Sequence, residues 1–383
     1  MKVEFYRHSL GEAEKRAVGE VLDSLFLTTG PRTREFEAAF ARYLGVPTCI
    51  GLSSCTAGLF LVLKHWDLGP DDRVVVPAMT FIASANVVRH VGAQVAFCDV
   101  DRQTGLLDLN AVEGMLKRDT RVRAVMPVHL YGQMVDMKGL RGLAERHGVR
   151  ILEDSAHCIE GERDGVRPGK LGDAAAFSFY ATKNLACGEG GAVATGDAGL
   201  ADYLAISRLH GMSKSALHRH ERYEHWDMDF PGYKANMCDI QAALLLPQLA
   251  RVDALWQRRE AIARRYESAF DAAGVEYPRT VPGVRHARHL FTIWAPDGTR
   301  DRFVTLLQER GVGVVVNYLA VHLRHYYRET LGCREGDFPA AEMIGSRTLS
   351  IPFYPGLTDA EVDYVIQVVV ETQQAVLAGP TRG

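Results

Sequence analysis

The sequence predicts an α/β fold: a large domain with a mostly parallel central sheet, followed by a smaller α+β domain. Short apolar runs recur between residues 47 and 197, helix-like stretches separate most of them, and this texture changes beyond residue 248. With 383 residues, of which 47% are hydrophobic and 24% charged, the chain has the composition of a globular protein with room for two domains. We expect a large domain over residues 1–248 and a small domain over residues 249–383.

The expected strands of the large domain are seven apolar runs that contain β-branched residues. They cover residues 47–54, 73–78, 94–101, 122–129, 150–156, 174–181 and 191–197. Helix-like stretches such as 57–66 and 136–148 lie between them. Because ligands collect at the carboxyl ends of parallel strands, a polar residue that closes such a run is a site candidate.

The small domain begins with a long amphipathic pattern over residues 251–274, in which apolar positions recur at helical spacing. Apolar runs follow at 289–296 and 312–319, with a helical pattern at 300–311 between them and a last helix at 359–377. This order is typical of a small α+β unit.

Charge, hydropathy and cysteine usage narrow the function classes. Lys and Arg number 44 against 47 Asp and Glu, so no global positive field is available for nucleic acid or an anionic membrane. The first residues lack the apolar core of a signal peptide, and no uncharged apolar run approaches a membrane span, so we expect a cytoplasmic protein. The seven cysteines are scattered without a C-x-x-C pair, which indicates reduced thiols and no zinc site.

Residues 151–195 carry the chemistry that the sequence makes most visible. Asp154 closes one apolar strand, and Ser178 and Lys183 follow the next strong strand signal, so all three are expected at one rim. Pyridoxal phosphate (PLP) needs a lysine for its aldehyde, a carboxylate for its pyridine nitrogen and donors for its phosphate, and these residues are suitable in kind and spacing. Each alone has an ordinary explanation as a turn, cap or solvated residue, but the combination favours a cofactor site.

A second feature lies where the first strand passes through Ser53, Ser54, Cys55 and Thr56 into an apolar helix. The free N–H groups and the positive dipole end of a helix suit a phosphate. Simple N-capping by Ser or Thr is the competing interpretation. The chain has neither G-x-G-x-x-G nor G-x-x-x-x-G-K-[ST], so a Rossmann dehydrogenase or a P-loop enzyme lacks its signature.

These residues resemble the DegT/DnrJ/EryC1/StrS sugar aminotransferases, which have the aspartate-aminotransferase-like fold (PLP fold type I). The resemblance runs over nearly the whole chain, and its most specific part is the segment around Lys183. The matching segments are FLTTGPRTREFE, GLSSCTAGL, VVVPAMTFIASANVV, VMPVHLYGQMVDM, EDSAHCIEG, LGDAAAFSFYATKNLACGEGGAV, RLHGMS, PGYKANMCDIQAALLLPQL and EGDFPAAEMIGSRTLSIPFYPGLTD.

The resemblance implies a role for each matching position. Lys183 would bond to PLP and Asp154 would pair with the ring nitrogen, with Phe81 stacked on the ring and His157 beside it. The backbone at Cys55 and Thr56 and the Ser178 hydroxyl would hold the phosphate. A loop of the neighbouring subunit would also reach the phosphate, through Asn236 first and Lys234 second, in a homodimer with shared sites. Contacts to the sugar substrate are expected from Thr29, Tyr318 and His322.

The chain departs from the family pattern at two places and carries one histidine-rich stretch. Cys55 stands where glycine is usual, and the frequent H-Y-x-P-x-H pattern appears as residues 317–322 without its first His and its Pro. His218, His220 and His225 suggest metal binding, but an exposed loop is the better explanation because no recognisable ligand spacing is completed. We therefore predict no metal site.

The predicted function is a PLP-dependent transfer of an amino group from L-glutamate to a nucleotide-linked keto sugar. The segments FLTTGP, EGDFPAAE and YPGLTD look most like 4-aminotransferases that act on UDP, dTDP or GDP sugars, so a 4-keto (or 3-keto) 6-deoxy sugar is expected. Pyridoxamine phosphate (PMP) would carry the amine between the two half-reactions. A PLP- or PMP-dependent sugar dehydratase is one alternative, which Lys183 disfavours because those relatives commonly have histidine there. A catalytically silent regulator of the same fold is another, which the intact set of Lys183, Asp154 and Ser178 disfavours.

Overall fold

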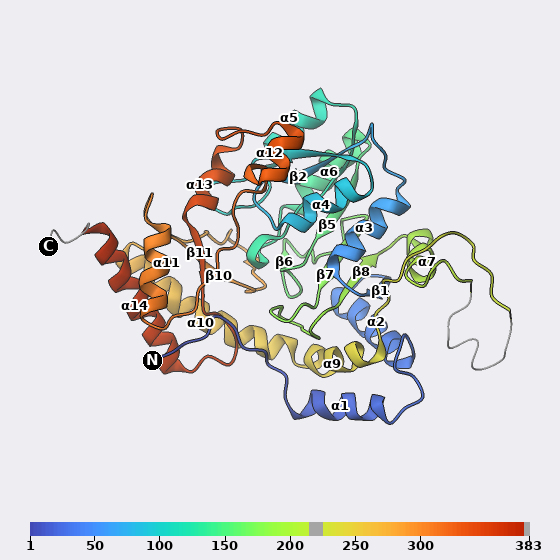
Figure 1. Ribbon diagram of the computed structural model, residues 1–383, viewed down its shortest axis with the longest axis horizontal. Helices are drawn as coiled ribbons and strands as arrows, with labels where there is room; N and C mark the ends of the chain where they lie inside the picture. The colour runs from blue at the N-terminus through green and yellow to red at the C-terminus, as the bar shows by residue number, and fades with distance from the viewer. Residues whose placement is uncertain (214–224, 379–383) are drawn as a thin grey trace.

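The computed structural model describes residues 1–213 and 225–378, and a single sheet lies at the centre of this part of the chain (Figure 1). Its seven strands follow the order β1, β8, β7, β5, β4, β2, β3. Each of the seven predicted apolar runs contains one of them. The bounds are β1 Thr48–Leu52, β2 Arg73–Pro77, β3 Gln94–Cys98, β4 Val122–Val125, β5 Arg150–Asp154, β7 Ala174–Ser178 and β8 Gly191–Thr195.

The sheet is mostly parallel, as expected. Strands β7, β5, β4, β2 and β3 pair in parallel, whereas β8 pairs antiparallel with both β7 and β1. Both faces are buried: along β7, Ala174 and Ala176 belong to one hydrophobic core, and Ala175 and Phe177 belong to another. Burial of both faces explains why the strands read as continuous apolar runs without alternation.

Helices cover the sheet, with α3 (Cys55–His65) packed against β5, β7 and β8 and α2 (Pro31–Leu44) against β1. Several begin where a side chain caps the free N–H groups: Ser54 accepts from the Ala57 N–H, and Asp136 from that of Gly139. The other helices described among the first 250 residues, outside 214–224, are α1 (Glu12–Leu22), α4 (Ile82–His90), α5 (Leu109–Arg118), the 3-10 turn η1 (Leu130–Gly132), α6 (Met137–His147), α7 (Ala198–Ser207) and α9 (Asp239–Ala250).

A separate hydrophobic core lies beside the long helix α10 (Val252–Ala273). Around it stand α11 (Arg300–Glu309), α14 (Asp359–Leu377) and the antiparallel pair β10 (Phe291–Trp294) and β11 (Thr348–Ile351), all at one end of the molecule (Figure 1). The apolar run 312–319 contains no named strand. It makes isolated bridges instead, from Val312 to Val3 and from Val315 to Ser350.

The chain crosses between the two ends of the molecule more than once. Val3, near the start of the chain, belongs to the core beside α10. After the 3-10 turn η2 (Val321–Leu323), the chain returns to the large sheet, and two helices dock there: α12 (His325–Leu331) and α13 (Pro339–Arg347). There Asp99 accepts hydrogen bonds from the first N–H groups of α13. A short pair, β6 (Glu162–Arg163) with β9 (Val284–Arg285), also joins the two halves. The domain boundary expected from the sequence, between residues 248 and 249, falls inside α9 and stays a prediction.

Candidate active site

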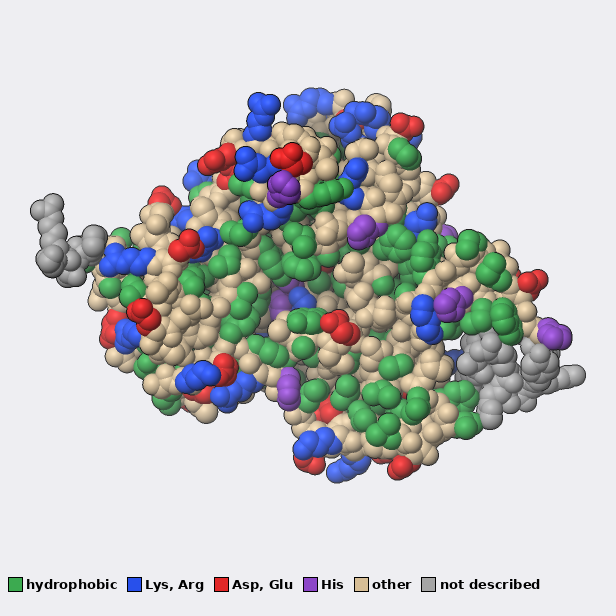
Figure 2. Space-filling model, viewed as in Figure 1, with side chains coloured by type: hydrophobic (Ala, Val, Ile, Leu, Met, Phe, Trp, Pro, Cys, Tyr) green, Lys and Arg blue, Asp and Glu red, His purple; other side chains and the backbone are tan. Residues whose placement is uncertain are grey.

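A cavity of about 500 Å³ opens at the carboxyl ends of β5 and β7. A volume of this size suits a cofactor with a small substrate. Figure 2 shows a hollow near the middle of the visible face, with hydrophobic side chains around it and His and cationic side chains inside. The residues that line the cavity are Phe5, Ser54, Cys55, Thr56, Leu59, Thr80, Phe81, Ala83, Val128, Asp154, Ala156, His157, Ser178, Tyr180, Thr182, Lys183, Glu189, Gly190, Val315, Asn317 and Tyr318.

Asp154 is the last residue of β5, and its carboxylate is nearly buried, with 6% of the residue exposed. Oδ2 accepts a hydrogen bond from Ser84 Oγ at 2.7 Å, and Oδ1 accepts from the Ala156 N–H at 3.1 Å. Both partners are donors that stabilise an ionised carboxylate. Asp154 pairs in register with Ala176 of β7, so the carboxylate stands beside the strand that leads to Lys183.

Lys183 lies five residues after the end of β7, and its backbone N–H donates to the Tyr180 carbonyl. Burial lowers the pKa of its amine from 10.5 to about 8, and the charge of Asp154 acts against that shift. A lysine must be neutral to attack a carbonyl, so a lowered pKa places more of the reactive form near neutral pH. An amine in this state is chemically able to act as a nucleophile toward a carbonyl.

The cavity also presents donors suited to an anion. Ser54 and Thr56 line the cavity at the start of α3, where N–H groups and the positive dipole end are exposed. Strand β8 approaches this turn closely, because a Cβ on Gly191 would clash with the backbone of Ser54 and Cys55. Ser178 Oγ accepts from the Tyr180 N–H at 3.3 Å, which leaves its own proton to donate.

Cys55 is the first residue of α3, and its thiol lies inside this arrangement. Sγ is 3.9 Å from Asp154 Oδ1, and burial raises the pKa of the thiol well above its usual value, as does the neighbouring carboxylate. The thiol is therefore protonated and can donate weakly to Asp154. A cysteine thus fits at the position where the resemblance to the family implies glycine.

Aromatic and imidazole rings form the remaining wall. The Phe81 ring is 50% exposed and lies 5.5 Å from that of Tyr318. His157 Nδ1 accepts from the Tyr131 N–H at 3.2 Å, so in the neutral ring Nε2 carries the proton and faces Tyr318 Oη at 3.1 Å. Burial lowers the pKa of His157 well below its usual value, as does the charge of Lys183, so the ring is neutral near pH 7.

Three residues expected at the site do not line the cavity. The Asn236 amide donates to Thr29 Oγ1 at 2.8 Å, and the two form a pair in the loops before α2 and α9. The His322 ring is fully buried against Phe97 and Phe338, and Nε2 is 3.0 Å from Glu342 Oε1. The structure therefore does not bring His322 to the cavity, because η2 turns it toward α13.

Two residues at the site were not predicted from the sequence. Ser84 binds Asp154 from the first turn of α4, and His289 Nε2 lies 3.4 Å from Lys183 Nζ. Ser84 could have been found, since it follows Phe81 by one helical turn. His289 could not, because it precedes strand β10, whereas our criterion selected polar residues at the carboxyl ends of strands.

In residues 1–213 and 225–378, no group of three or more His, Cys, Asp or Glu is placed to hold a metal ion. His218 and His220 lie outside the described residues. No helix of the described chain combines the length and the apolarity that crossing a bilayer requires.

Comparison with known proteins identifies the family. Residues 8–370 match the model of the DegT/DnrJ/EryC1/StrS aminotransferase family. The chain is 42% identical over 368 residues to the spore coat polysaccharide biosynthesis protein SpsC of Bacillus subtilis (strain 168), with 94% of each chain covered.

Solved structures agree with this assignment. The PMP and PLP forms of the putative sugar aminotransferase Spr1654 from Streptococcus pneumoniae superpose with TM-scores of 0.92 and 0.91 at 30% identity, covering 98% of this chain and 100% of theirs. DesV of S. venezuelae gives a TM-score of 0.87 at 36% identity, with 94% of each chain covered. The chain therefore belongs to the DegT/DnrJ/EryC1/StrS family of PLP-dependent aminotransferases, which have fold type I.

Proposed function

We propose that this aminotransferase moves an amino group from L-glutamate to a nucleotide-linked keto sugar, with a 4-keto-6-deoxy sugar as the preferred acceptor. One observation carries the proposal: Lys183, Asp154 and an anion-binding helix start meet in one cavity. The relatives named above support the sugar class, since SpsC is a polysaccharide biosynthesis protein and Spr1654 a putative sugar aminotransferase.

The described residues fit PLP. Ser178 and the start of α3 supply donors for a phosphate, and Asp154 supplies a carboxylate that accepts a hydrogen bond from Ser84. Lys183 supplies an amine with a lowered pKa, and the half-exposed Phe81 supplies a flat apolar surface. Each chemical part of the cofactor thus has a partner of matching chemistry.

When bound, PLP supplies a ring that accepts electrons from the carbon that loses its proton. Asp154 holds the proton of the ring nitrogen, because a buried carboxylate stabilises a neighbouring cation. Lys183 carries the proton between carbon atoms, since its amine is neutral in part near pH 8. Tyr318 and Phe81 exclude water from the mouth of the cavity and orient the sugar.

We propose a homodimer with shared sites, in which Asn236, with Lys234 second, reaches the phosphate of the neighbouring copy and Thr29 lies at the sugar. Asn236 and Thr29 support this role because they form a pair outside the cavity of their own chain. Mixing Lys183→Ala and Asn236→Ala chains tests it. Random exchange should restore about one quarter of the wild-type activity, because half of the dimers carry one intact site of two. No recovery would contradict a shared site.

The experiment for the reaction separates its two halves. L-glutamate should remove the visible absorbance of the PLP-loaded protein, and the correct member of a panel of UDP, dTDP and GDP keto sugars should restore it. Mass spectrometry of the product then distinguishes an amino sugar from the deoxygenated product of a dehydratase. Borohydride reduction followed by peptide mapping should tag Lys183.

Two outcomes would contradict the proposal. A tag on another lysine would remove Lys183 from the chemistry. A loaded protein that keeps its absorbance with every amino donor would favour a silent regulator of the same fold.

A further inference from the structure

A chain of polar contacts runs from Lys183 away from the cavity. Lys183 Nζ lies 3.4 Å from His289 Nε2, and His289 Nδ1 lies 3.4 Å from Asn184 Oδ1. The Asn184 amide nitrogen donates to Glu160 Oε2 at 2.8 Å, and Glu160 is paired with the buried Arg259 of α10. The contacts therefore connect the lysine to a helix of the second core.

The orientation of the Asn184 amide fixes the tautomer of His289. Asn184 Nδ2 donates to the Ala287 carbonyl at 2.9 Å as well as to Glu160, and a carbonyl oxygen can only accept. The nitrogen of the amide thus faces these two acceptors, and Oδ1 faces His289. An acceptor opposite Nδ1 requires that Nδ1 carry the imidazole proton. Nε2 is then left with a lone pair directed at Lys183 Nζ.

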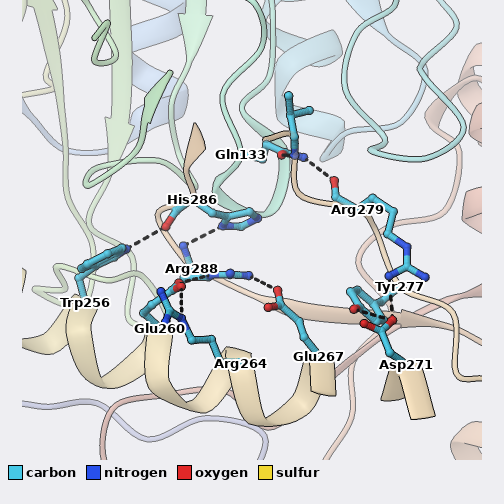
Figure 3. A network of polar contacts seen from close by, with 11 residues as sticks. Gln133, Trp256, Glu260, Arg264, Glu267, Asp271, Tyr277, Arg279, His286 and Arg288 are labelled. Atoms are coloured by element: carbon cyan, nitrogen blue, oxygen red, sulfur yellow. Dashed lines mark hydrogen bonds and ion pairs between the residues drawn. The ribbon is translucent and has the colours of Figure 1, made fainter. Parts of the chain in front are cut away.

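His289 is held rigidly in this position. Its backbone N–H donates to the Tyr131 carbonyl at 3.2 Å, and only 5% of the residue is exposed. The preceding residue, Arg288, donates to Glu260 and Glu267 of α10 at 2.7 Å each, and Figure 3 shows the guanidinium between these two carboxylates. Because the His289 ring is fixed, its Nε2 acceptor stays in the same position relative to Lys183.

We propose that His289 is a positioning residue for Lys183: its Nε2 accepts a hydrogen bond from Nζ, while Asn184 fixes the proton on Nδ1. This inference rests on the proposed function, because it takes Lys183 as the lysine that bonds to PLP. The accepted hydrogen bond keeps the amine in one rotamer and stabilises its protonated form more than its neutral form.

Four titratable groups act on the Lys183 amine. Asp154 and Cys55 face it from β5 and α3, and His157 and His289 face it from the other side. Burial lowers the pKa of both histidines well below the usual value, so neither competes for the proton near pH 7. Asp154 is the anion of this set, and the contribution of His289 is that of a neutral acceptor.

The test measures Lys183 in the cofactor-free protein by the pH dependence of its acetylation, with the modified peptide quantified by mass spectrometry. His289→Phe keeps a ring and removes the acceptor, so the midpoint should fall by about one pH unit. His289→Gln places an amide oxygen near the Nε2 position, so its acetylation midpoint should return most of the way to the wild-type value. His286→Phe is the matched control, because His286 Nδ1 accepts from the Arg288 N–H and does not contact Lys183.

The loaded enzyme provides a second measurement. His289→Phe should slow the half-reaction with L-glutamate by about tenfold, with His289→Gln closer to wild type. Equal midpoints for His289→Phe and His286→Phe would overturn the inference and leave His289 a packing residue. Absence of the borohydride tag on Lys183 in the wild-type protein would instead refute the proposed function, so the two failures are distinguishable.

Discussion

The two walls of the cavity are held in place by different kinds of contact. Asp154 and Ser178 end neighbouring parallel strands, so the backbone hydrogen bonds of the sheet position the first wall. The second wall and its support belong to the later chain: Tyr318 lines the cavity, and His289 contacts Lys183 without lining it. Their positions depend on side chains such as Arg288 and on docking against α10. We infer that substitutions in the first wall change the chemistry of a folded protein, whereas substitutions in the second change positions and stability.

The largest effect should come from Lys183 itself. Lys183→Ala should slow the single-turnover reaction of the loaded protein with L-glutamate by about 10³-fold or more, because it removes both the covalent anchor and the base. Lys170→Ala is the control, since Lys170 lies exposed in the same part of the chain. A Lys183→Ala protein within tenfold of wild type would show that the first wall does not carry the chemistry.

Asp154→Asn should have the next largest effect, a loss of about 10²-fold in the same reaction, because an amide cannot stabilise the ring cation as a carboxylate does. The fold should stay intact, which circular dichroism would show. Ser84→Ala removes only one donor to Asp154 and should cost about tenfold or less. If both variants lost activity equally, the hydrogen bond from Ser84, and not the charge of Asp154, would account for the contribution of Asp154 to the reaction.

His322→Gln tests a buried histidine of the later chain that the structure places away from the cavity. The ring binds Glu342, which also accepts from the Gly336 and Phe338 N–H groups, so the variant should lose about 2 kcal/mol in urea denaturation with little change in KM for the sugar. Tyr318→Phe should raise the KM for the sugar with little loss of stability, since the Tyr318 hydroxyl lies at the cavity. A raised KM without lost stability in His322→Gln would support the substrate contact expected from the sequence.

The pH dependence of folding should show a smaller effect. Burial lowers the pKa of Lys183 from 10.5 to about 8. Across this window the unfolded chain holds a proton that the folded chain has released, so the stability contributed by this group rises with pH. Lys183→Met in the cofactor-free protein should therefore stabilise by about 1 kcal/mol more near neutral pH than near pH 10. A difference that grew with pH would mean that the folded protein favours the charged amine.

Local patterns were enough to predict the first wall. The seven strands are visible as apolar runs because the sheet is buried on both faces, and the residues that close β5 and β7 mark its carboxyl edge. Asp154, Ser178 and Lys183 lie within 30 residues of one another, so neighbouring parallel strands were sufficient to bring them together. Ser84 was within reach of the same reasoning but was missed.

The sequence by itself determined the parallel sheet, the rim at its carboxyl edge and the lysine and carboxylate that stand there. Only the tertiary structure decided that His289 contacts Lys183 and that His322 faces α13. Both histidines lie in connecting segments of the later chain, and their spacing carries no information about the contacts that each one makes. Their positions follow from long-range docking, since α13 packs on the large sheet and Arg288 binds α10.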